Sequence, residues 1–128
     1  MCCLLYLELV VGRGWNMLAE GHRKKAERIE GSLAKLQPEV DPDGVIEMAW
    51  GASFQWIAFG CETKYHQHQN NHTRLGRFLN SLGARTVANW WDNLDQLRQG
   101  GWYGSEPDRA EVQEAVALLE EIRLWATH

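Results

Sequence analysis

The polar segment 64–72 holds the densest group of side chains that could bind a metal or move a proton. Three of the five histidines, His66, His68 and His72, fall within it. On a continuous helix, His68 and His72 would share a face at i,i+4, a spacing that can chelate a transition metal. The Asn70-Asn71 pair favours a solvated loop instead, and no His-Glu-x-x-His motif is present. We therefore expect no metal or other cofactor, and His66, His68 and His72 are the candidate ligands if a metal binds.

A second group surrounds Arg98, which is followed by two glycines and by the aromatic pair Trp102 and Tyr103. An arginine near a helix C-terminus is favourable with the helix dipole whatever the function, and the aromatic pair could simply plug the end of a bundle. The same residue types can also grip a phosphate and stack a base. The candidate nucleotide- or RNA-binding residues are Arg98, Trp102, Tyr103, His72 and Lys64.

His22 falls on the apolar-leaning face of the first predicted helix, and we interpret it as a satisfied core or interface histidine rather than a catalyst. The residues after it form the only local basic run (Arg23, Lys24, Lys25 and Arg28). Such a run is typical of a solvated helix face, with a phosphate-binding strip as the alternative. No Ser-His-Asp arrangement, phosphate-binding glycine loop or dinucleotide-binding fingerprint is visible.

The elements that must position these groups are predicted to be helices. From Trp15, apolar-leaning residues recur at steps of three or four until Pro38 ends the pattern. The stretch from Asp43 to about Lys64 is apolar around most of its circumference and is predicted to be the central helix. Its Gly51 and Gly60 would permit close approach of a neighbouring helix.

Three further helices are predicted after the histidine-rich loop. A short one over residues 75–82 ends at Gly83, and a fourth is capped by Thr86 and stopped by Gly100-Gly101. Asp108 with Glu111 has the spacing of a capping box at the start of a fifth. No strand pattern is present, and the short connections predict an all-α, five-helix, up-and-down bundle.

Length and composition fit one domain at 15–128, preceded by residues 1–14 as an apolar N-terminal arm or first helical turn. That arm is too short to span a bilayer and lacks the positive start of a signal peptide. Three cysteines, an odd number, suit free thiols in the cytoplasm. The net charge of −4 argues against a broad electrostatic grip on nucleic acid.

Four segments together resemble the HEPN family (higher eukaryotes and prokaryotes nucleotide-binding). Ser53–Phe59 is similar to that family's central helix, and His72–Leu79 to its loop histidine before a short leucine-bearing helix. Asn93–Gly104 resembles its Leu-x-x-x-Arg segment ending in an aromatic residue, and Asp108–Trp125 its acidic-capped last helix. The resemblance covers the chain from about Trp15 to its end and implies a HEPN-like bundle.

The resemblance implies a dimer and a choice between two functions. Catalytic members of the family are metal-independent ribonucleases, often toxins or defence effectors, whose Arg and following His face a shared cleft. Arg98 matches the arginine, but Tyr103 stands where the histidine is expected, and tyrosine is a poor proton shuttle at neutral pH. Non-catalytic members bind nucleotides or partner proteins, and some pair with a nucleotidyltransferase in toxin–antitoxin systems.

The sequence thus predicts a cytoplasmic, non-catalytic HEPN-like module, forming a homodimer without membrane contact. It would engage a nucleotide, RNA or a partner protein such as a nucleotidyltransferase. The alternative is a ribonuclease in which Arg98 acts with Tyr103, or with a histidine such as His72 brought in by the fold. A second alternative is a bundle that binds metal through the histidine cluster.

Overall fold

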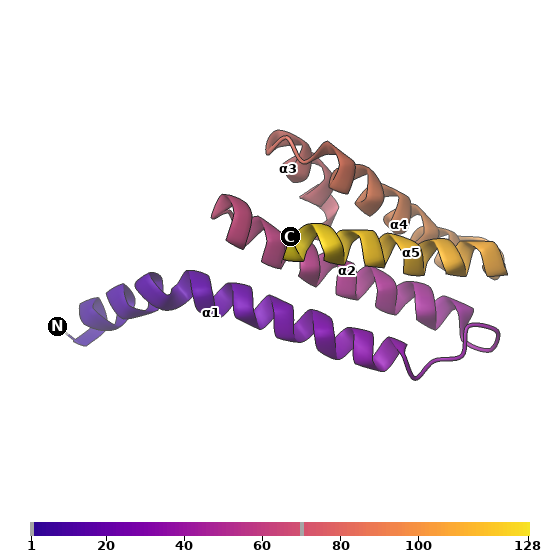
Figure 1. Cartoon of the computed structure of the whole chain (residues 1–128), viewed down its shortest axis with the longest axis horizontal. Coiled ribbons are helices and arrows are strands. Elements are labelled where there is room, and N and C mark those ends of the chain that lie inside the picture. The colour runs from indigo at the N-terminus through magenta and orange to yellow at the C-terminus, as the bar shows by residue number, and fades with distance from the viewer. Residues whose placement is uncertain (1, 70) are drawn as a thin grey trace.

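The computed structural model describes the backbone of residues 2–69 and 71–128 and the side chains of residues 18–69 and 71–128. Its elements are α1 (Cys2–Leu33), α2 (Pro42–Tyr65), the short 3-10 helix η1 (His72–Arg74), α3 (Leu75–Ser81), α4 (Arg85–Tyr103) and α5 (Arg109–Thr127). No strand occurs in this described part, so the predicted all-α class is confirmed (Figure 1). The side chains of the predicted arm, residues 1–14, lie outside the described residues.

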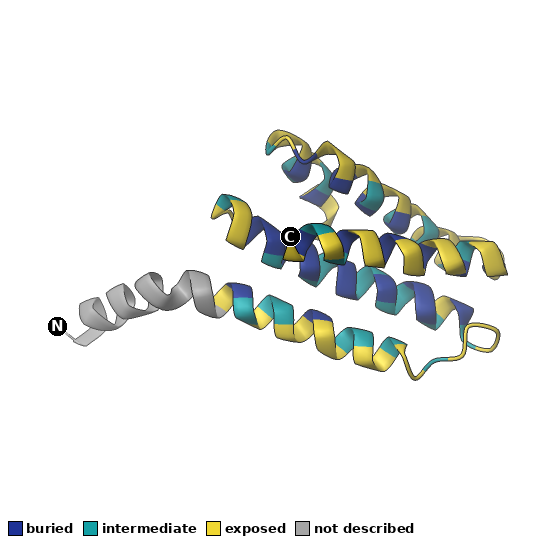
Figure 2. Ribbon diagram, in the orientation of Figure 1, coloured by how far each residue is buried: buried dark blue, intermediate teal, exposed yellow. Residues whose placement is uncertain are grey.

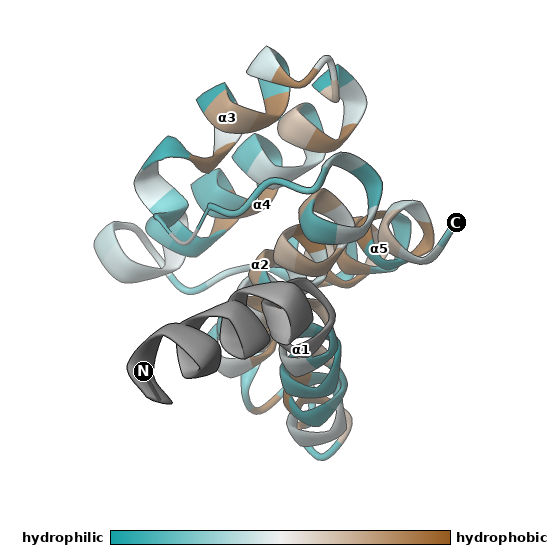
Figure 3. Ribbon diagram, turned by 90° about the vertical axis from the view of Figure 1, so that its left-hand side faces the viewer, coloured by the Kyte–Doolittle hydropathy of each residue, from teal (hydrophilic) through white to brown (hydrophobic). Residues whose placement is uncertain are grey.

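Helix α2 lies at the centre of the molecule, between α1 on one side and α4 and α5 on the other (Figure 3). Its observed start and end lie within one residue of the predicted ones, Asp43 and Lys64. Pro42 occupies the first turn, where its missing N–H removes no helical hydrogen bond, and Asp43 follows with favourable negative charge. Most residues of α2 are buried or half-buried. The described part of α1 and the whole of α5, by contrast, each expose many residues along the helix (Figure 2).

The core forms around α2, where α1, α4 and α5 pack against it and α3 packs against α4. Its largest fully buried side chains are Trp91, Ile46, Ile57, Leu75, Leu79, Leu94 and Ile122. The predicted close approach is confirmed at Gly60, where a Cβ atom would lie 2.5 Å from Cζ3 of Trp125. None of the helices, over the residues described, is long and apolar enough to cross a membrane.

The predicted boundaries of α4 are wrong at both ends. The helix begins at Arg85 after Ala84, so Thr86 lies inside the first turn and provides no side-chain cap. Its C-terminal end is Tyr103, because Gly100 and Gly101 continue the helix instead of stopping it. A Cβ atom on Gly101 would lie only 2.8 Å from Oδ1 of Asp43, so glycine here lets α4 approach α2.

Two other predicted helix signals are confirmed. Gly83 adopts a positive φ of 80° just after α3, the conformation expected of a glycine that ends a helix. Asp108 accepts a hydrogen bond from the backbone N–H of Glu111 at 2.8 Å, and the Glu111 side chain accepts one in return from the Asp108 backbone N–H. The capping box therefore fixes where α5 begins.

Candidate functional site

Arg98 of α4 is held against α2 by a carboxylate. Its Nε atom donates hydrogen bonds to Oε1 and Oε2 of Glu47, at 3.1 and 3.0 Å. One turn along each helix, Nε1 of Trp50 donates to Oδ1 of Asp95 at 2.9 Å. Glu47 and Trp50 are three residues apart, as are Asp95 and Arg98, so each pair projects from one face of its helix. The two pairs lock α4 to α2.

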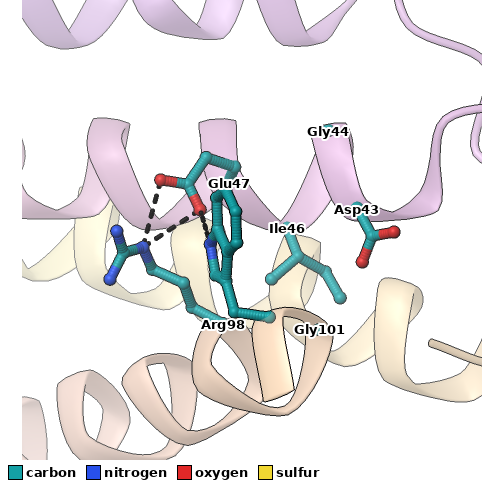
Figure 4. A pocket seen from close by; sticks show the side chains of 7 residues that line it. Asp43, Gly44, Ile46, Glu47, Arg98 and Gly101 are labelled. Carbon is teal, nitrogen blue, oxygen red and sulfur yellow. Dashed lines mark hydrogen bonds and ion pairs between the residues drawn. The ribbon is translucent and has the colours of Figure 1, made fainter. Parts of the chain in front are cut away.

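The guanidinium group of Arg98 also lies over the indole of Trp50, with 4.0 Å between Cζ and the ring centroid. Arginine at this distance from a tryptophan face gains cation–π attraction. Figure 4 shows the two terminal nitrogens of Arg98 pointing away from Glu47, and they donate no hydrogen bond to any other described residue. Arg98 is thus fixed at Nε and stacked, while its two Nη groups remain available as donors.

A cavity of about 440 Å³ opens beside Arg98, between the start of α2 and the end of α4. Nε1 of Trp102 donates to Oε2 of Glu47 at 3.2 Å, although the Trp102 side chain is 67% exposed. Tyr103 is more exposed still and borders a second hollow with Arg98 and Trp102. The first cavity is lined by Asp43, Gly44, Ile46, Glu47, Arg98, Gly101 and Trp102. The carboxylates in this lining offset the single arginine charge.

His72, the first residue of η1, also contacts the indole of Trp50. Its ring makes an edge contact with Trp50, with 5.3 Å between centroids, and a longer one with Phe54 at 6.5 Å. Asn71 positions it by capping η1, since its Oδ1 atom accepts a hydrogen bond from the backbone N–H of Thr73 at 3.0 Å. The fold therefore brings His72 and Arg98, 26 positions apart, to one tryptophan.

Lys64 is the predicted binding residue that does not join this surface. It follows Trp50 by 14 positions on α2, which is about 20 Å along the helix axis. Its Nζ atom lies 5.5 Å from the ring centroid of Trp125 on α5. Arg98, Trp102 and His72 thus each contact Trp50 or Glu47, two residues that the sequence interpretation did not single out. Tyr103 lies beside Arg98 and Trp102.

A second polar cluster lies near the other end of α2 and consists of His22, Glu62 and His68. One ligand-type atom from each lies within 4.8 Å of the others. His66 makes this possible, because it adopts a left-handed conformation (φ 55°) at the end of α2 and turns the chain back. Nδ1 of His68 then comes 2.6 Å from Oε1 of Glu62.

The predicted metal candidates are therefore divided by the structure. Only His68 belongs to the group of potential ligands found in the described residues, whereas His66 ends α2 and His72 contacts Trp50. The other two members, His22 and Glu62, were missed. A signal existed, since Gln55 and Glu62 are seven positions apart and so share one face of α2, and His22 was placed on the inner face of α1.

Polar atoms in this cluster are buried without partners. The Glu62 side chain has no exposed surface, and its Oε2 atom has no hydrogen-bond partner. His22 is satisfied at Nδ1, which lies 2.7 Å from Oε1 of Gln55, but its Nε2 atom has no hydrogen bond and lies 3.4 Å from Oε1 of Glu62. Burial, and then the Glu62 charge, raises the pKa of neighbouring Cys61 to about 12, so that thiol is neutral at pH 7.

Comparison of the chain with protein-family models, with curated proteins and with solved structures finds no significant match.

Proposed function

We propose that this chain is a non-catalytic, HEPN-like binding module that engages the phosphate and base of a nucleotide or of single-stranded RNA around Arg98. The observation that carries the proposal is the state of the arginine. Its Nε is anchored by Glu47 and its plane is stacked on Trp50, which leaves the Nη groups free to donate. The proposal takes the five helices as an up-and-down bundle of HEPN type and places the protein in the cytoplasm.

A pre-oriented arginine fork suits a phosphate group because two parallel N–H groups can meet two phosphate oxygens. Little conformational entropy remains to be lost on binding, since Glu47 and Trp50 already fix the side chain. The exposed indole of Trp102 lies beside the fork and offers a face on which a base can stack. Phosphate and base would thus be held by neighbouring side chains of one helix, α4.

The nearby acidic groups shape the expected binding. Asp43 and Glu47 offset the charge of Arg98, so affinity must come from directed hydrogen bonds and stacking rather than from a positive field. We therefore expect a shallow salt dependence on single-stranded RNA, with a slope of log K against log salt of about −0.7, the value for one neutralised phosphate of a single strand. A steep slope would instead require a basic surface elsewhere on the chain.

The proposed assembly is a homodimer in which the two Arg98 surfaces lie near each other. Trp102 and Tyr103 support this, because both present large aromatic side chains to solvent, and such residues are enriched at protein interfaces. Sedimentation equilibrium should give twice the chain mass of 14.7 kDa. A monomer at every concentration would remove the dimer from the proposal and leave the Arg98 surface as a single site.

The test compares two arginines that are both partly buried and paired with carboxylates. Arg98→Ala should weaken binding of a single-stranded RNA oligonucleotide and of ATP at least about tenfold, the loss expected for a charge-assisted contact. Arg123→Ala is the matched control, since Arg123 pairs with Glu30 at 3.1 Å on α1. Fluorescence anisotropy and calorimetry give the affinities. Absent binding by the wild type, or equal losses in both variants, would refute the proposal and favour a protein partner.

A ribonuclease is the second candidate, and the position of His72 favours it. An imidazole is the side chain best suited to general acid–base catalysis near pH 7, and His72 shares Trp50 with the phosphate-binding arginine. Incubation with transfer RNA and single-stranded RNA distinguishes the two functions. Cleavage that is lost in both Arg98→Ala and His72→Ala would make the chain an enzyme, whereas intact RNA with retained binding supports the module.

A further inference from the structure

The cluster of His22, Glu62 and His68 is separate from the Arg98 surface, about 20 Å further along α2. Each side chain comes from a different segment: His22 from α1, Glu62 from the last turns of α2, and His68 from the loop after it. Glu62 is the buried member, and its Oε1 atom lies between the two imidazoles, 2.6 Å from Nδ1 of His68 and 3.4 Å from Nε2 of His22.

The hydrogen bond at Nδ1 of His22 defines what its other nitrogen presents. Because a carboxamide oxygen can only accept, Nδ1 must donate to Oε1 of Gln55. In the neutral ring, Nε2 then carries a lone pair, and this lone pair faces the carboxylate oxygen of Glu62. Two acceptors at 3.4 Å in a buried setting repel each other unless a proton or a metal ion lies between them.

The second oxygen of Glu62 also indicates that a positively charged partner belongs in this cluster. Oε2 is buried and has no hydrogen-bond partner, although a carboxylate without exposed surface normally has its lone pairs satisfied. No lysine or arginine is paired with Glu62 among the described residues. No lysine or arginine of the described part thus supplies positive charge at the point where three potential ligand atoms converge, which leaves a proton or a metal ion to do so.

We propose that His22, Glu62 and His68 bind one divalent first-row transition-metal ion, of which Zn²⁺ is the probe used below. Two imidazole nitrogens and one carboxylate oxygen suit zinc, iron, cobalt or nickel, whereas magnesium and calcium favour all-oxygen sites. Three protein ligands leave at least one coordination position for water or a further ligand. His68 provides the access, since its side chain is partly exposed while Glu62 is closed off.

The distances fit an ion with modest adjustment. Ligands about 2.0–2.2 Å from a tetrahedral ion lie about 3.4 Å from one another, which matches the separation of His22 Nε2 from Glu62 Oε1. The contact between His68 and Glu62 would lengthen from 2.6 Å, a change that falls on a residue outside any helix. Gln55 meanwhile plays the role of the outer residue that accepts the second N–H of a metal-bound histidine.

The experiment uses the full chain, freed of any affinity tag, stripped with a chelator and equilibrated with Zn²⁺. Elemental analysis by inductively coupled plasma mass spectrometry should find one zinc ion per wild-type chain. Binding of zinc should also raise the Tm of the wild type. Glu62→Gln and His22→Gln should each weaken zinc binding at least about 100-fold and abolish the rise in Tm. His72→Gln is the control from the same segment and should keep the wild-type affinity.

Two further readouts keep the proposal refutable if a variant folds poorly. Circular dichroism of metal-free Glu62→Gln shows whether it is folded, and the visible spectrum of the Co²⁺-loaded wild type reports the number and type of ligands. Absence of zinc from the wild type, or full affinity in folded Glu62→Gln, would refute the site. Loss of zinc in His66→Gln and His72→Gln, but not in His22→Gln, would place the ion in the histidine loop instead. These outcomes are independent of nucleotide binding at Arg98.

Discussion

Glu47 and Glu62 occupy the same helix, yet their surroundings differ in one respect that matters for chemistry. Glu47, near the start of α2, accepts hydrogen bonds from Arg98 and Trp102 and keeps a third of its side-chain surface exposed. Glu62, near the end, has no exposed surface, and one of its oxygens has no partner. The first carboxylate therefore orients an arginine, whereas the second is buried with one oxygen atom that has no partner.

The difference shows how one residue type serves two roles on one scaffold. A satisfied carboxylate is a positioning group, and what it positions is the fork of Arg98. An unsatisfied buried carboxylate beside two imidazoles is itself a candidate ligand, because leaving it uncompensated costs stability. Substitutions around these two carboxylates should therefore affect the two regions differently.

The largest effect is expected at Trp50, which links Arg98 of α4 to His72 of η1. Its indole contacts Arg98, His72, Phe54 and Trp91, and its N–H is bonded to Asp95. Trp50→Ala should lower the free energy of unfolding by about 3 kcal/mol, through lost packing and an unpaired acceptor. Urea denaturation followed by circular dichroism measures it.

Trp102→Ala is the control for this prediction, because it removes the same side chain from an exposed position. It should cost no more than about 1 kcal/mol of stability while still weakening nucleotide binding. Similar stability losses in the two variants would show that Trp50 is not the hub of this region.

Gln55 should control the metal site without contacting the ion. Gln55→Ala removes the acceptor for Nδ1 of His22, so we expect the zinc affinity to fall about 10- to 100-fold while one ion is still bound. Competition with a chromophoric chelator gives the affinity. Gln99→Ala, which removes an exposed glutamine bonded to Asp95, should leave it unchanged. An unchanged affinity in Gln55→Ala would argue that His22 is not a ligand.

The same substitution at the two carboxylates should change stability in opposite directions. In the metal-free chain, Glu62→Gln should raise the free energy of unfolding by about 1–2 kcal/mol, because a buried, under-compensated charge is removed and the new amide can donate to Nε2 of His22. Glu47→Gln should lower it by about 1 kcal/mol, since Arg98 loses its charged partner in a partly exposed pair. Denaturation with chelator present measures both, and changes of the same sign would remove the contrast.

The helices could be predicted from the sequence because local signals determine them. The apolar circumference of the segment from Asp43 to Lys64, the turn at Gly83 and the capping box of Asp108 with Glu111 all depend on neighbouring residues. The ends of α4 could not be predicted in the same way. Gly101 continues the helix at the point where α4 passes close to Asp43 of α2, a residue distant in the sequence, and this proximity leaves no local signal.

The same limit applies to the candidate sites. Arg98 and Trp102 were recognisable because they are four positions apart in the sequence, but the grouping of His72 with them depends on how η1 docks against Trp50. The Glu62 cluster needs the left-handed turn at His66 and the packing of α1 on α2 at once. Spacing alone favoured His68 with His72, because sequence periodicity assumes that a helix continues.

The smallest effect is expected at Asp92 of α4, a carboxyl on the Arg98 side of the molecule. Replacing it tests whether its charge stabilises the fold. Burial, and then the nearby charge of Asp95, raises the pKa of the Asp92 carboxyl above its ordinary value. The Asp92 carboxyl lies against Gly76 of α3, since a Cβ atom on Gly76 would lie 2.6 Å from Oδ1 of Asp92. A raised pKa in the folded state means that the folded chain binds the proton more tightly than the unfolded chain. Stability therefore falls as pH rises from the ordinary pKa of the carboxyl through its raised value in the folded chain.

Asp92→Asn should therefore be slightly more stable than the wild type at pH 7, and the gain should vanish in acid, where both forms are neutral. Calorimetric Tm values across this pH range measure the difference, with the exposed Glu114→Gln as the control. A wild type more stable than Asp92→Asn at pH 7 would mean that the Asp92 charge stabilises α4. The carboxylates of Asp92 and Glu47 would then both be compensated, unlike that of Glu62.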